Sequence, residues 1–393
     1  MRILATFVGG WGHAEPLLAV AQIAARRGHS VTFVGQSAVV PRLADLGFDT
    51  VAVGPATVGP DRRPLVPVDR DHERRVIRDH FAGTIADFRA GWLAELFERR
   101  KPDVIVCDEA DFGAMIAAER LGIPRASVCV IAAGTLAGHD VLAEPLALLR
   151  HQHGLPPDPD MAMLGGDLLL VPVPLRFRDP GVPLPHTAHL VRPPILEQVA
   201  GAARRDKRSP DQPPLVYITL GTIFNVESGD LFARLIDAVR DLDAEVVVSV
   251  GPYLSPDELG PLPDHVRVEQ FVDQADVLPS CGAVVCHGGS GTTISSLALG
   301  VPLVVLPMGA DQPDNAERCT ALGVGVTLDP VDARPPDIAV AISTLLGDPA
   351  YAERAGQLAL ECEALLPTDH AVDLIEALVT TTPSTPMPGE TPR

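Results

Sequence analysis

Short apolar runs alternate with amphipathic stretches along the first third of the chain. Residues 3–8 are apolar, a Gly-rich turn follows, and residues 15–27 have the spacing of an amphipathic helix that ends at Gly28. The rhythm continues with apolar runs at 30–34, 51–53, 103–107 and 126–131 and helical stretches at 39–46, 73–100 and 110–121. Strand, helix and strand in this order predict a parallel sheet with helices on both of its faces.

Residues 150–213 interrupt this rhythm, and the pattern then starts again. Prolines recur throughout the stretch, and because proline disrupts helix interiors, only loops and short strands are expected there. After it come apolar runs at 215–220, 245–250, 266–269, 283–286 and 301–306, helical stretches at 230–240 and 292–299, and a last helix at 369–380. The restart predicts a second parallel-sheet domain.

The chain therefore predicts an α/β fold with two doubly wound, Rossmann-like domains. The first covers residues 1–201 and the second 215–380, and the last helix is able to pack back on the first domain. The basic stretch 202–214 indicates a solvated linker, and the Thr- and Pro-rich residues 381–393 are expected to form a disordered tail. Ligands of such domains bind at the carboxyl ends of the strands, so a site is expected in the cleft between the domains.

Composition narrows the class of protein. With 393 residues the chain is long enough for two domains, and 46% hydrophobic against 4% aromatic residues indicates an aliphatic core. A net charge of −20 argues against nucleic acid or an anionic membrane as a partner. The cysteines form no C-x-x-C pair, which favours buried, reduced thiols over a metal site. No apolar segment resembles a signal peptide or a membrane span, so we expect a cytoplasmic protein.

A Gly-rich turn in the second half carries the most specific chemistry. The apolar run 283–286 ends in His287, a Gly-rich stretch follows, and a helix opens near Thr292. Glycines let the backbone approach a ligand, and free N–H groups at a helix N-terminus attract phosphate. The next strand runs into Asp311 and Gln312, whose carboxylate and amide can hydrogen-bond a polyol. A diphosphate site beside a sugar site implies a nucleotide sugar.

From His287 through Gly-Val-Pro to Asp-Gln-Pro-x-Asn-Ala, this stretch resembles the donor-binding motif of inverting, nucleotide-sugar-dependent glycosyltransferases of the GT-B fold. It is similar in style to the bacterial enzymes that glycosylate natural products such as antibiotics. A doubly wound domain whose glycines only allow tight packing would leave residues 311–316 unexplained. The resemblance implies two Rossmann-like domains facing across a cleft, with the acceptor bound by the first and the nucleotide sugar by the second.

The resemblance also assigns donor-binding residues. Asp311 and Gln312 would hold the sugar, Phe271 would stack on the base, and main-chain groups of Val272 would pair with the edge of the base. The residues expected to converge on the diphosphate are Gly221, Thr222, His287, Gly288, Gly289, Ser290, Gly291 and Thr292. Because these groups and the helix dipole offset the phosphate charge, no metal and no cofactor besides the sugar nucleotide is expected. The two Asp-x-Asp sequences, at 158–160 and 241–243, indicate loop carboxylates.

His13 is the candidate general base. It lies in the loop after the first strand, at the start of the first helix, and a helix N-terminus disfavours imidazolium, which helps to keep the ring neutral near pH 7. The family carries Gly-His with Pro three residues later at this place. Asp108 ends the strand at 103–107 on the same edge and can orient the ring. Glu109 and Asp111 are the alternatives if the strand end is misplaced.

One position in the motif bears on the nucleotide. Family members that use uridine donors often carry Glu eight residues after the motif His, where its carboxylate accepts hydrogen bonds from the ribose hydroxyls. This chain has Ser295 there. The absence of that acceptor fits a nucleotide without a 2′-hydroxyl, so a thymidine diphosphate sugar is favoured over a uridine diphosphate sugar.

The expected activity is inverting hexosyl transfer, with a sugar or deoxysugar moved to a hydroxyl of a hydrophobic secondary metabolite. The acceptor pocket is expected from the loops at 54–71, 79–92 and 133–149, with the apolar candidates Phe81, Phe88, Trp92, Leu136 and Leu142. A uridine diphosphate donor and C-glycosylation remain alternatives. A nucleotide-sugar epimerase or a non-catalytic binding protein fits less well, because His13 and Asp108 are both present. A homodimer is compatible with this interpretation.

Overall fold

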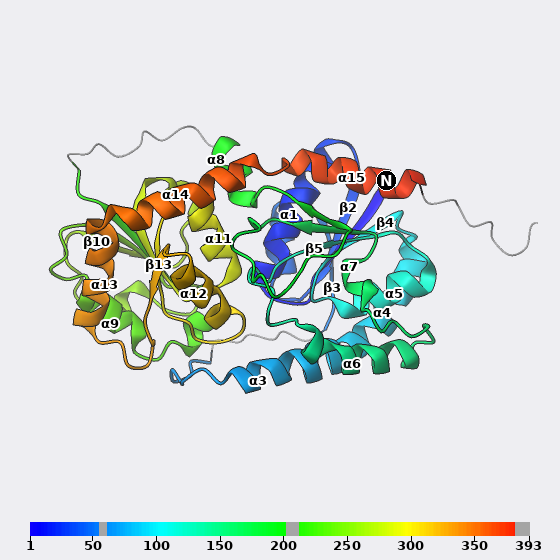
Figure 1. The fold of residues 1–393 in the computed structure, drawn as a ribbon, viewed down its shortest axis with the longest axis horizontal. Coiled ribbons are helices and arrows are strands. Elements are labelled where there is room, and N and C mark those ends of the chain that lie inside the picture. The colour runs from blue at the N-terminus through cyan, green and yellow to red at the C-terminus, as the bar shows by residue number, and fades with distance from the viewer. Residues whose placement is uncertain (55–60, 202–211, 382–393) are drawn as a thin grey trace, which may run out of the picture.

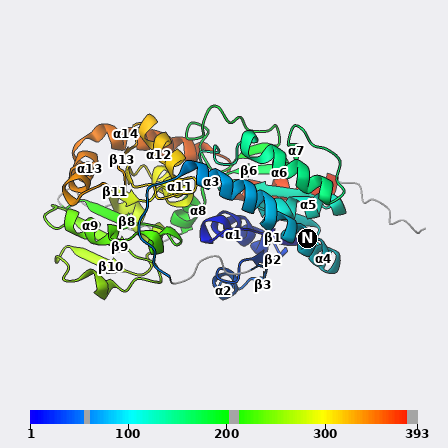
Figure 2. The same cartoon turned by 90° about the horizontal axis from the view of Figure 1, so that it is seen from below.

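The computed structural model describes residues 1–54, 61–201 and 212–381. Two α/β domains lie side by side, each with its own parallel sheet between helices (Figures 1 and 2). The prediction of two doubly wound domains is therefore confirmed. Most of the predicted linker, the predicted tail beyond Thr381 and part of the loop at 54–71 lie outside the described residues, and the predicted domain boundaries stay predictions.

The first sheet has seven strands in the order β3-β2-β1-β4-β5-β6-β7, all parallel. Ile3 lies opposite Val31 on one side and Val104 on the other, so β1 is a central strand and is apolar on both faces. The strand order reverses between β1 and β4, and at such a point a crevice opens at the carboxyl ends of the strands. The strands are β1 (Arg2–Thr6), β2 (Ser30–Gly35), β3 (Asp49–Ala52), β4 (Val104–Asp108), β5 (Arg125–Val128), β6 (Leu168–Val171) and β7 (Ala188–Leu190).

The helix expected at 73–100 consists of three pieces. They are α3 (Arg70–Arg75), a π-helical segment η1 (Val76–Ile85) and α4 (Ala86–Arg100), and the backbone is non-helical at Gly83 with φ −105° and ψ −106°. The other helices before the second sheet are α1 (Trp11–Arg26), α2 (Val40–Asp45), α5 (Phe112–Leu121), α6 (His139–Gln152), α7 (Ala162–Gly165) and α8 (Pro194–Gly201).

Much of segment 133–149, expected to be a loop that lines the acceptor pocket, is helical, because α6 begins at His139. Its role in acceptor binding stays a prediction. Four aliphatic residues between positions 141 and 149 form a buried face of this helix. Their burial outweighs the local effect of Pro145, which lies inside the helix.

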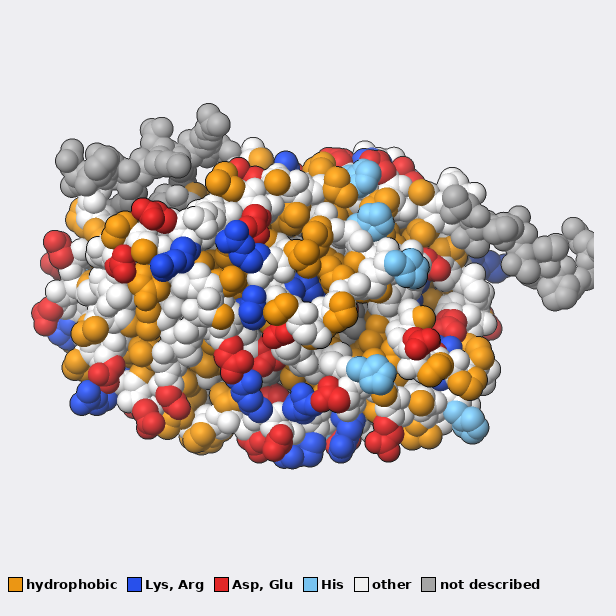
Figure 3. All heavy atoms as spheres, in the orientation of Figure 1, with side chains coloured by type: hydrophobic (Ala, Val, Ile, Leu, Met, Phe, Trp, Pro, Cys, Tyr) orange, Lys and Arg blue, Asp and Glu red, His pale blue; other side chains and the backbone are white. Residues whose placement is uncertain are grey.

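The described part of the loop at 54–71, also expected to line the acceptor pocket, crosses to the second domain. Arg62 forms an ion pair with Glu258 at 2.6 Å, and Arg70 forms one with Asp314 at 3.2 Å. Basic and acidic side chains lie together along the lower centre of the face in Figure 3, below the junction of the two domains. This segment therefore connects the two domains over one margin of the cleft.

The second sheet has six parallel strands in the order β10-β9-β8-β11-β12-β13. Its order reverses between β8 and β11, which places a second crevice at the carboxyl ends of these two strands. The strands are β8 (Leu215–Thr219), β9 (Glu245–Ser249), β10 (Val266–Glu269), β11 (Cys281–Cys286), β12 (Leu303–Val305) and β13 (Gly325–Thr327).

The last helix of the described chain belongs spatially to the first domain. In α15 (Thr368–Thr381), Ala371, Val372 and Ile375 are fully buried in the same apolar cluster as β1 and α1 (Figure 1). The remaining helices are η2 (Phe224–Glu227), α9 (Leu231–Ala238), η3 (Pro256–Leu259), α10 (Gln274–Val277), η4 (Leu278–Ser280), α11 (Ser290–Ala298), α12 (Gln312–Ala321), α13 (Pro335–Gly347) and α14 (Pro349–Ala364). Among the described residues, no helix combines the length and the apolar character needed to cross a membrane.

Candidate active site

His13 lies at the carboxyl edge of the first sheet, where the strand order reverses. Helix α1 begins at Trp11, so His13 is in its first turn and not in the preceding loop. The ring lies directly against Gly9, where an added Cβ would come within 2.0 Å of His13 Cδ2. A glycine is therefore required at position 9 for the ring to keep this place. The His13 side chain is 25% exposed and so remains accessible from the cleft.

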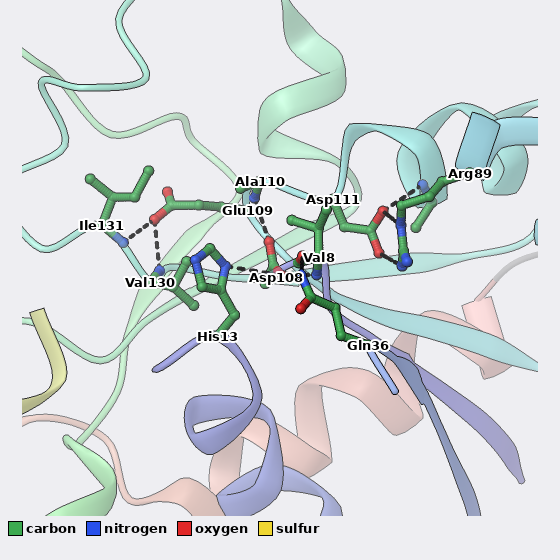
Figure 4. Close-up of polar contacts among 11 residues, drawn as sticks. Val8, His13, Gln36, Arg89, Asp108, Glu109, Ala110, Asp111, Val130 and Ile131 are labelled. Carbon is green, nitrogen blue, oxygen red and sulfur yellow. Dashed lines mark hydrogen bonds and ion pairs between the residues drawn. The ribbon is translucent and has the colours of Figure 1, made fainter. Parts of the chain in front are cut away.

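Asp108 is the last residue of β4 and faces His13 (Figure 4). Its carboxylate is fully buried, and Oδ2 lies 3.2 Å from His13 Nδ1. The same Oδ2 accepts the N–H of Val8 at 2.8 Å, and Oδ1 accepts the N–H of Ala110 at 2.7 Å. These bonds hold the carboxylate so that Nδ1 carries the ring proton. Nε2 is then the nitrogen with a free electron pair.

The two alternative carboxylates point elsewhere (Figure 4). Glu109 Oε1 accepts the N–H groups of Val130 at 2.7 Å and Ile131 at 2.5 Å. Asp111 forms a buried, bidentate ion pair with Arg89, with oxygen–nitrogen distances of 2.9 and 2.5 Å. Among these three carboxylates, the structure brings Asp108 into hydrogen-bonding distance of His13.

The environment of His13 raises its pKa above the ordinary value of 6.5. Burial alone lowers the pKa, but the charge of Asp108, the hydrogen bond to it, and the charges of Asp311 and Glu109 outweigh burial. This direction is opposite to the one expected from the helix N-terminus alone. Asp311 belongs to the second domain, so both domains set the proton affinity of this ring.

His287 follows β11 at the corresponding edge of the second sheet. Its side chain is nearly buried, and burial lowers its pKa to about 4, against a smaller opposing effect of the Thr219 backbone. The ring is therefore neutral at pH 7. It fits between Gly221 and Gly289, where added Cβ atoms would come within 2.6 Å of Cε1 and 2.5 Å of Nε2. Its Nδ1 has no hydrogen-bond partner within the described part of the chain.

The predicted diphosphate residues gather at this edge. Gly221 follows β8 with φ +75°, Gly288 follows His287 with φ +89°, and α11 begins at Ser290. Thr292 Oγ1 accepts a hydrogen bond from Gln274 Nε2 at 3.0 Å, so its hydroxyl already has a protein partner. The structure thus brings the predicted glycines and His287 together around the N-terminus of α11.

Two side chains hold the Asp311 carboxylate in place, and its charge contributes to the raised pKa of His13. Its Oδ2 accepts hydrogen bonds from Ser290 Oγ at 2.5 Å and Asn315 Nδ2 at 2.9 Å. Burial raises the pKa of Asp311, although these two bonds lower it. Asn315 was not among the predicted site residues, although it lies in the Asp-Gln-Pro-x-Asn-Ala sequence. Gln312 turns inwards, because its Oε1 accepts the N–H groups of residues 308 and 309 at 2.7 and 3.2 Å.

Phe271 is exposed in the loop after β10 and is covered on one side by the first domain. The Arg42 guanidinium lies 4.6 Å from the centre of its ring and 3.6 Å from that of Trp11. Such cation–π contacts connect α1 and α2 to the predicted base-binding loop. Val272 is half-buried beside it, and Ser295 is half-buried on α11. The sequence carried no signal for Arg42, because the contact joins segments far apart along the chain.

Of the five apolar acceptor candidates, Phe81 stacks on His13, with ring centres 6.4 Å apart and 23° between planes. Phe88 is 53% exposed on α4. Trp92, Leu136 and Leu142 belong to an apolar cluster inside the first domain. A contact with the candidate base is therefore seen for Phe81.

Potential metal ligands do not cluster in the described residues: no three His, Cys, Asp or Glu side chains are grouped so that they could hold an ion. In the Asp-x-Asp sequence at 158–160, Asp158 accepts the N–H groups of Ala162 and Met163, both at 2.9 Å. It therefore caps α7.

Comparison with known proteins adds independent information. Residues 233–377 match the family described as erythromycin biosynthesis protein CIII-like, C-terminal domain. The chain is 30% identical over 437 residues to 4'-demethylrebeccamycin synthase of Lentzea aerocolonigenes, covering 96% of this chain and 99% of the relative. It is 30% identical over 394 residues to elloramycin glycosyltransferase ElmGT of Streptomyces olivaceus, covering 95% and 97%. Its fold is similar to that of spinosyn rhamnosyltransferase SpnG complexed with thymidine diphosphate, with a TM-score of 0.77, 23% identity, and 96% and 100% of the two chains covered.

Proposed function

Because the chain belongs to the GT-B glycosyltransferases of antibiotic and natural-product biosynthesis, we propose that it transfers a sugar or deoxysugar from a thymidine diphosphate sugar to a hydroxyl of a hydrophobic acceptor. The observation that carries the proposal is the His13–Asp108 pair, which lies at the crevice of the first sheet while Asp311 of the second domain acts on the same ring. Transfer proceeds with inversion at the anomeric carbon.

In the proposed mechanism His13 Nε2 takes the proton of the acceptor hydroxyl. The hydroxyl oxygen forms the bond to the anomeric carbon while the bond from that carbon to the diphosphate breaks. Asp108 keeps Nδ1 protonated and stabilises the imidazolium as it forms, which agrees with the raised pKa of His13.

The leaving diphosphate would be stabilised without a metal. The diphosphate would bind at the start of α11, next to its first backbone N–H groups and the positive end of its dipole. Gly288 and Gly289 would let a phosphate come close. The neutral His287 ring adds a hydrogen-bonding group that does not titrate near pH 7, since burial lowers its pKa to about 4.

The sugar would be held by Asp311. The side-chain hydrogen bonds from Ser290 and Asn315 both end on Oδ2, and Oδ1 would accept a sugar hydroxyl. Because the charge of Asp311 also acts on His13, a sugar bound by Asp311 would lie on the side of the second domain that faces the candidate base. Gln312 would contribute through its amide nitrogen, as its oxygen is bonded to the backbone.

Two observations support a thymidine nucleotide. Ser295 stands where uridine-specific relatives often carry the ribose-binding Glu, and the similar fold of spinosyn rhamnosyltransferase was solved with thymidine diphosphate. Phe271 and Val272 in the loop after β10 would hold the base.

The test is a transfer assay with thymidine and uridine diphosphate glucose, each offered with a panel of hydrophobic alcohols and phenols and analysed by mass spectrometry. We expect a glycosylated product to form with EDTA present in the assay, and we expect no such product with the His13→Ala variant. Epimerised donor in the absence of any acceptor would instead support an isomerase. A product resistant to acid hydrolysis would indicate C-glycosylation, and no product with any pair would refute the proposal.

A further inference from the structure

Four consecutive backbone N–H groups in the loop after β5 bind side chains from both domains. Those of Val130 and Ile131 donate to Glu109 Oε1 in the first domain, at 2.7 and 2.5 Å (Figure 4). Those of Ala132 and Ala133 donate across the cleft, to Ser290 Oγ at 2.7 Å and Asn315 Oδ1 at 3.2 Å. One short loop is therefore held from both sides.

The bonds to the second domain are needed because this loop is buried. Ala132 and Ala133 are 0% and 1% exposed, so their N–H groups would lack partners if the second domain were displaced without water entering. Arg178 NH1 lies 3.3 Å from Cys129 Sγ beneath the loop, and its charge faces Glu109. Glu109 therefore lies among the polar groups that hold residues 129–133 in place.

The loop connects the two halves of the active site. On one side, Glu109 follows Asp108, the partner of His13, in the chain. On the other, Ser290 and Asn315 both donate to Asp311 Oδ2. The backbone of residues 130–133 therefore joins two sets of hydrogen bonds, one to Glu109 beside the candidate base and one to the two side chains that hold Asp311.

We propose that Glu109 is a positioning residue that holds loop 130–133 in the conformation in which Ala132 and Ala133 bind Ser290 and Asn315, and that it thereby orients Asp311 towards the donor sugar. The role of Asp311 in this proposal rests on the proposed function. Glu109 itself touches neither His13 nor Asp311 through a hydrogen bond: its side chain acts on the loop.

The test compares binding of free thymidine diphosphate and thymidine diphosphate glucose by isothermal titration calorimetry. In Glu109→Ala the affinity for the sugar nucleotide should fall by about 5- to 150-fold, the range for a buried hydrogen-bonding group left without its partner. The affinity for the free diphosphate should stay within about twofold. Glu109→Gln should bind the sugar nucleotide with nearly the affinity of the wild type, because its amide oxygen can still accept hydrogen bonds from the two N–H groups. An equal loss for both ligands, or no loss, would overturn the proposal.

A double-mutant cycle tests the connection directly. Glu109→Ala and Asn315→Ala should be non-additive in the free energy of urea unfolding, although their side chains share no hydrogen bond, because both act on one loop. The matched control is Arg62→Ala, which removes an exposed ion pair across the same cleft and should be additive with Glu109→Ala. Additivity in both cycles would overturn the proposal even if the wild type bound no nucleotide, an outcome that would separately refute the proposed function. If Glu109→Ala does not fold, Glu109→Asp takes its place in the cycle, because its shorter side chain draws the carboxylate away from the two N–H groups. It should also be non-additive with Asn315→Ala, and additivity would overturn the proposal.

Discussion

At the scale of single residues, the candidate base depends on how its neighbours balance burial against charge. The His13 ring loses proton affinity through burial and regains more from Asp108, which is itself fixed by the N–H groups of Val8 and Ala110. Replacing a neighbour therefore alters the chemistry as directly as replacing the ring.

His13→Ala should reduce turnover by about 10²–10⁴-fold, the usual contribution of a general base. Binding of thymidine diphosphate should be nearly unchanged, because the proposed nucleotide site is on the other domain.

Asp108→Asn should lose less activity than His13→Ala, but it should also lose stability. Three donors point at the Asp108 carboxylate, and the NH₂ group of an asparagine would be turned towards one of them and could not accept its hydrogen bond. Steady-state kinetics with calorimetric binding separates the two effects. Full turnover in His13→Ala would remove the residue from the mechanism.

Gly9→Ala should inactivate the enzyme almost as completely as loss of His13. The added Cβ would lie 2.0 Å from the ring carbon Cδ2, so the ring has to leave its place beside Asp108. Gly12→Ala is the matched control, because a Cβ there meets nothing within 4 Å. Each variant adds one methyl group close to His13 in the chain, and equal activity of the two would show that the ring position is unimportant.

The activity should fall on the acid side through a pKa above 6.5, since only the neutral ring can accept a proton. Asp311→Asn removes one of the charges that raise this pKa, so the acid limb should move to lower pH, besides any weaker sugar binding. Asp314→Asn, on the same helix, serves as the control and should leave the limb in place. The measurement is the pH dependence of kcat/KM for the three proteins, which reports the pKa of the enzyme without bound substrate. If the pKa of the acid limb is the same in Asp311→Asn as in the wild type, the charge of Asp311 does not affect the proton affinity of His13.

At the scale of elements, the strand ends and the helix beginnings carry the site. Each sheet reverses its order beside a strand that a histidine follows in the chain: His13, in the first turn of α1, comes after β1, and His287 comes directly after β11. Helix α11 adds the N-terminal end of its dipole, and its second turn carries Ser295.

Ser295 predicts the nucleotide preference. A ribose 2′-hydroxyl buried without a partner costs about 1–3 kcal/mol, or roughly 5- to 150-fold in affinity, so thymidine diphosphate should bind more tightly than uridine diphosphate. Ser295→Glu should shift the preference towards uridine. Competition binding of the two free diphosphates tests both statements without knowledge of the acceptor. Tighter binding of uridine diphosphate to the wild type would refute the thymidine assignment alone.

At the scale of the whole molecule, the two domains are connected at several separate places. Arg42 contacts both Trp11 and Phe271, residues 61–75 reach the second domain through Arg62 and Arg70, and loop 130–133 binds α11 and α12. Helix α15 returns from the end of the second domain to the first sheet. The site is therefore an assembly of distant segments.

Ile375→Ala tests how much α15 contributes. This side chain is fully buried against the first domain, and such truncations cost about 2–5 kcal/mol of unfolding free energy. Leu360→Ala on α14 is the control, since Leu360 is 66% exposed and should change stability by about 0.5 kcal/mol or less. Urea unfolding measures both. A loss in Ile375→Ala no larger than in the control would show that α15 does not stabilise the first domain.

Local sequence was sufficient for the elements whose signals are contained in a short window. The apolar runs of β1, β4, β8 and β11, the Gly-rich turn at His287 and the Gly-His pair at the start of α1 all placed chemistry at strand ends, and the fold has these groups there. Periodicity was insufficient where two signals competed, as in α6, where a proline and a buried apolar face coexist, and at Gly83, where one glycine breaks a long helical pattern.

Only the tertiary structure decided which atoms meet. On paper Asp108 is the favoured partner of His13, with Glu109 and Asp111 as alternatives. The end of β4 and the turn after it point the three carboxylates in three directions, towards His13, the loop after β5 and Arg89. Burial lowers the pKa of His13, and the net rise comes first from Asp108 and then from Asp311, a residue of the second domain. Sequence alone determines the elements and the residue types at their ends, because these depend on near neighbours. Pairing and proton affinity depend on through-space distances that arise only when the two sheets pack together.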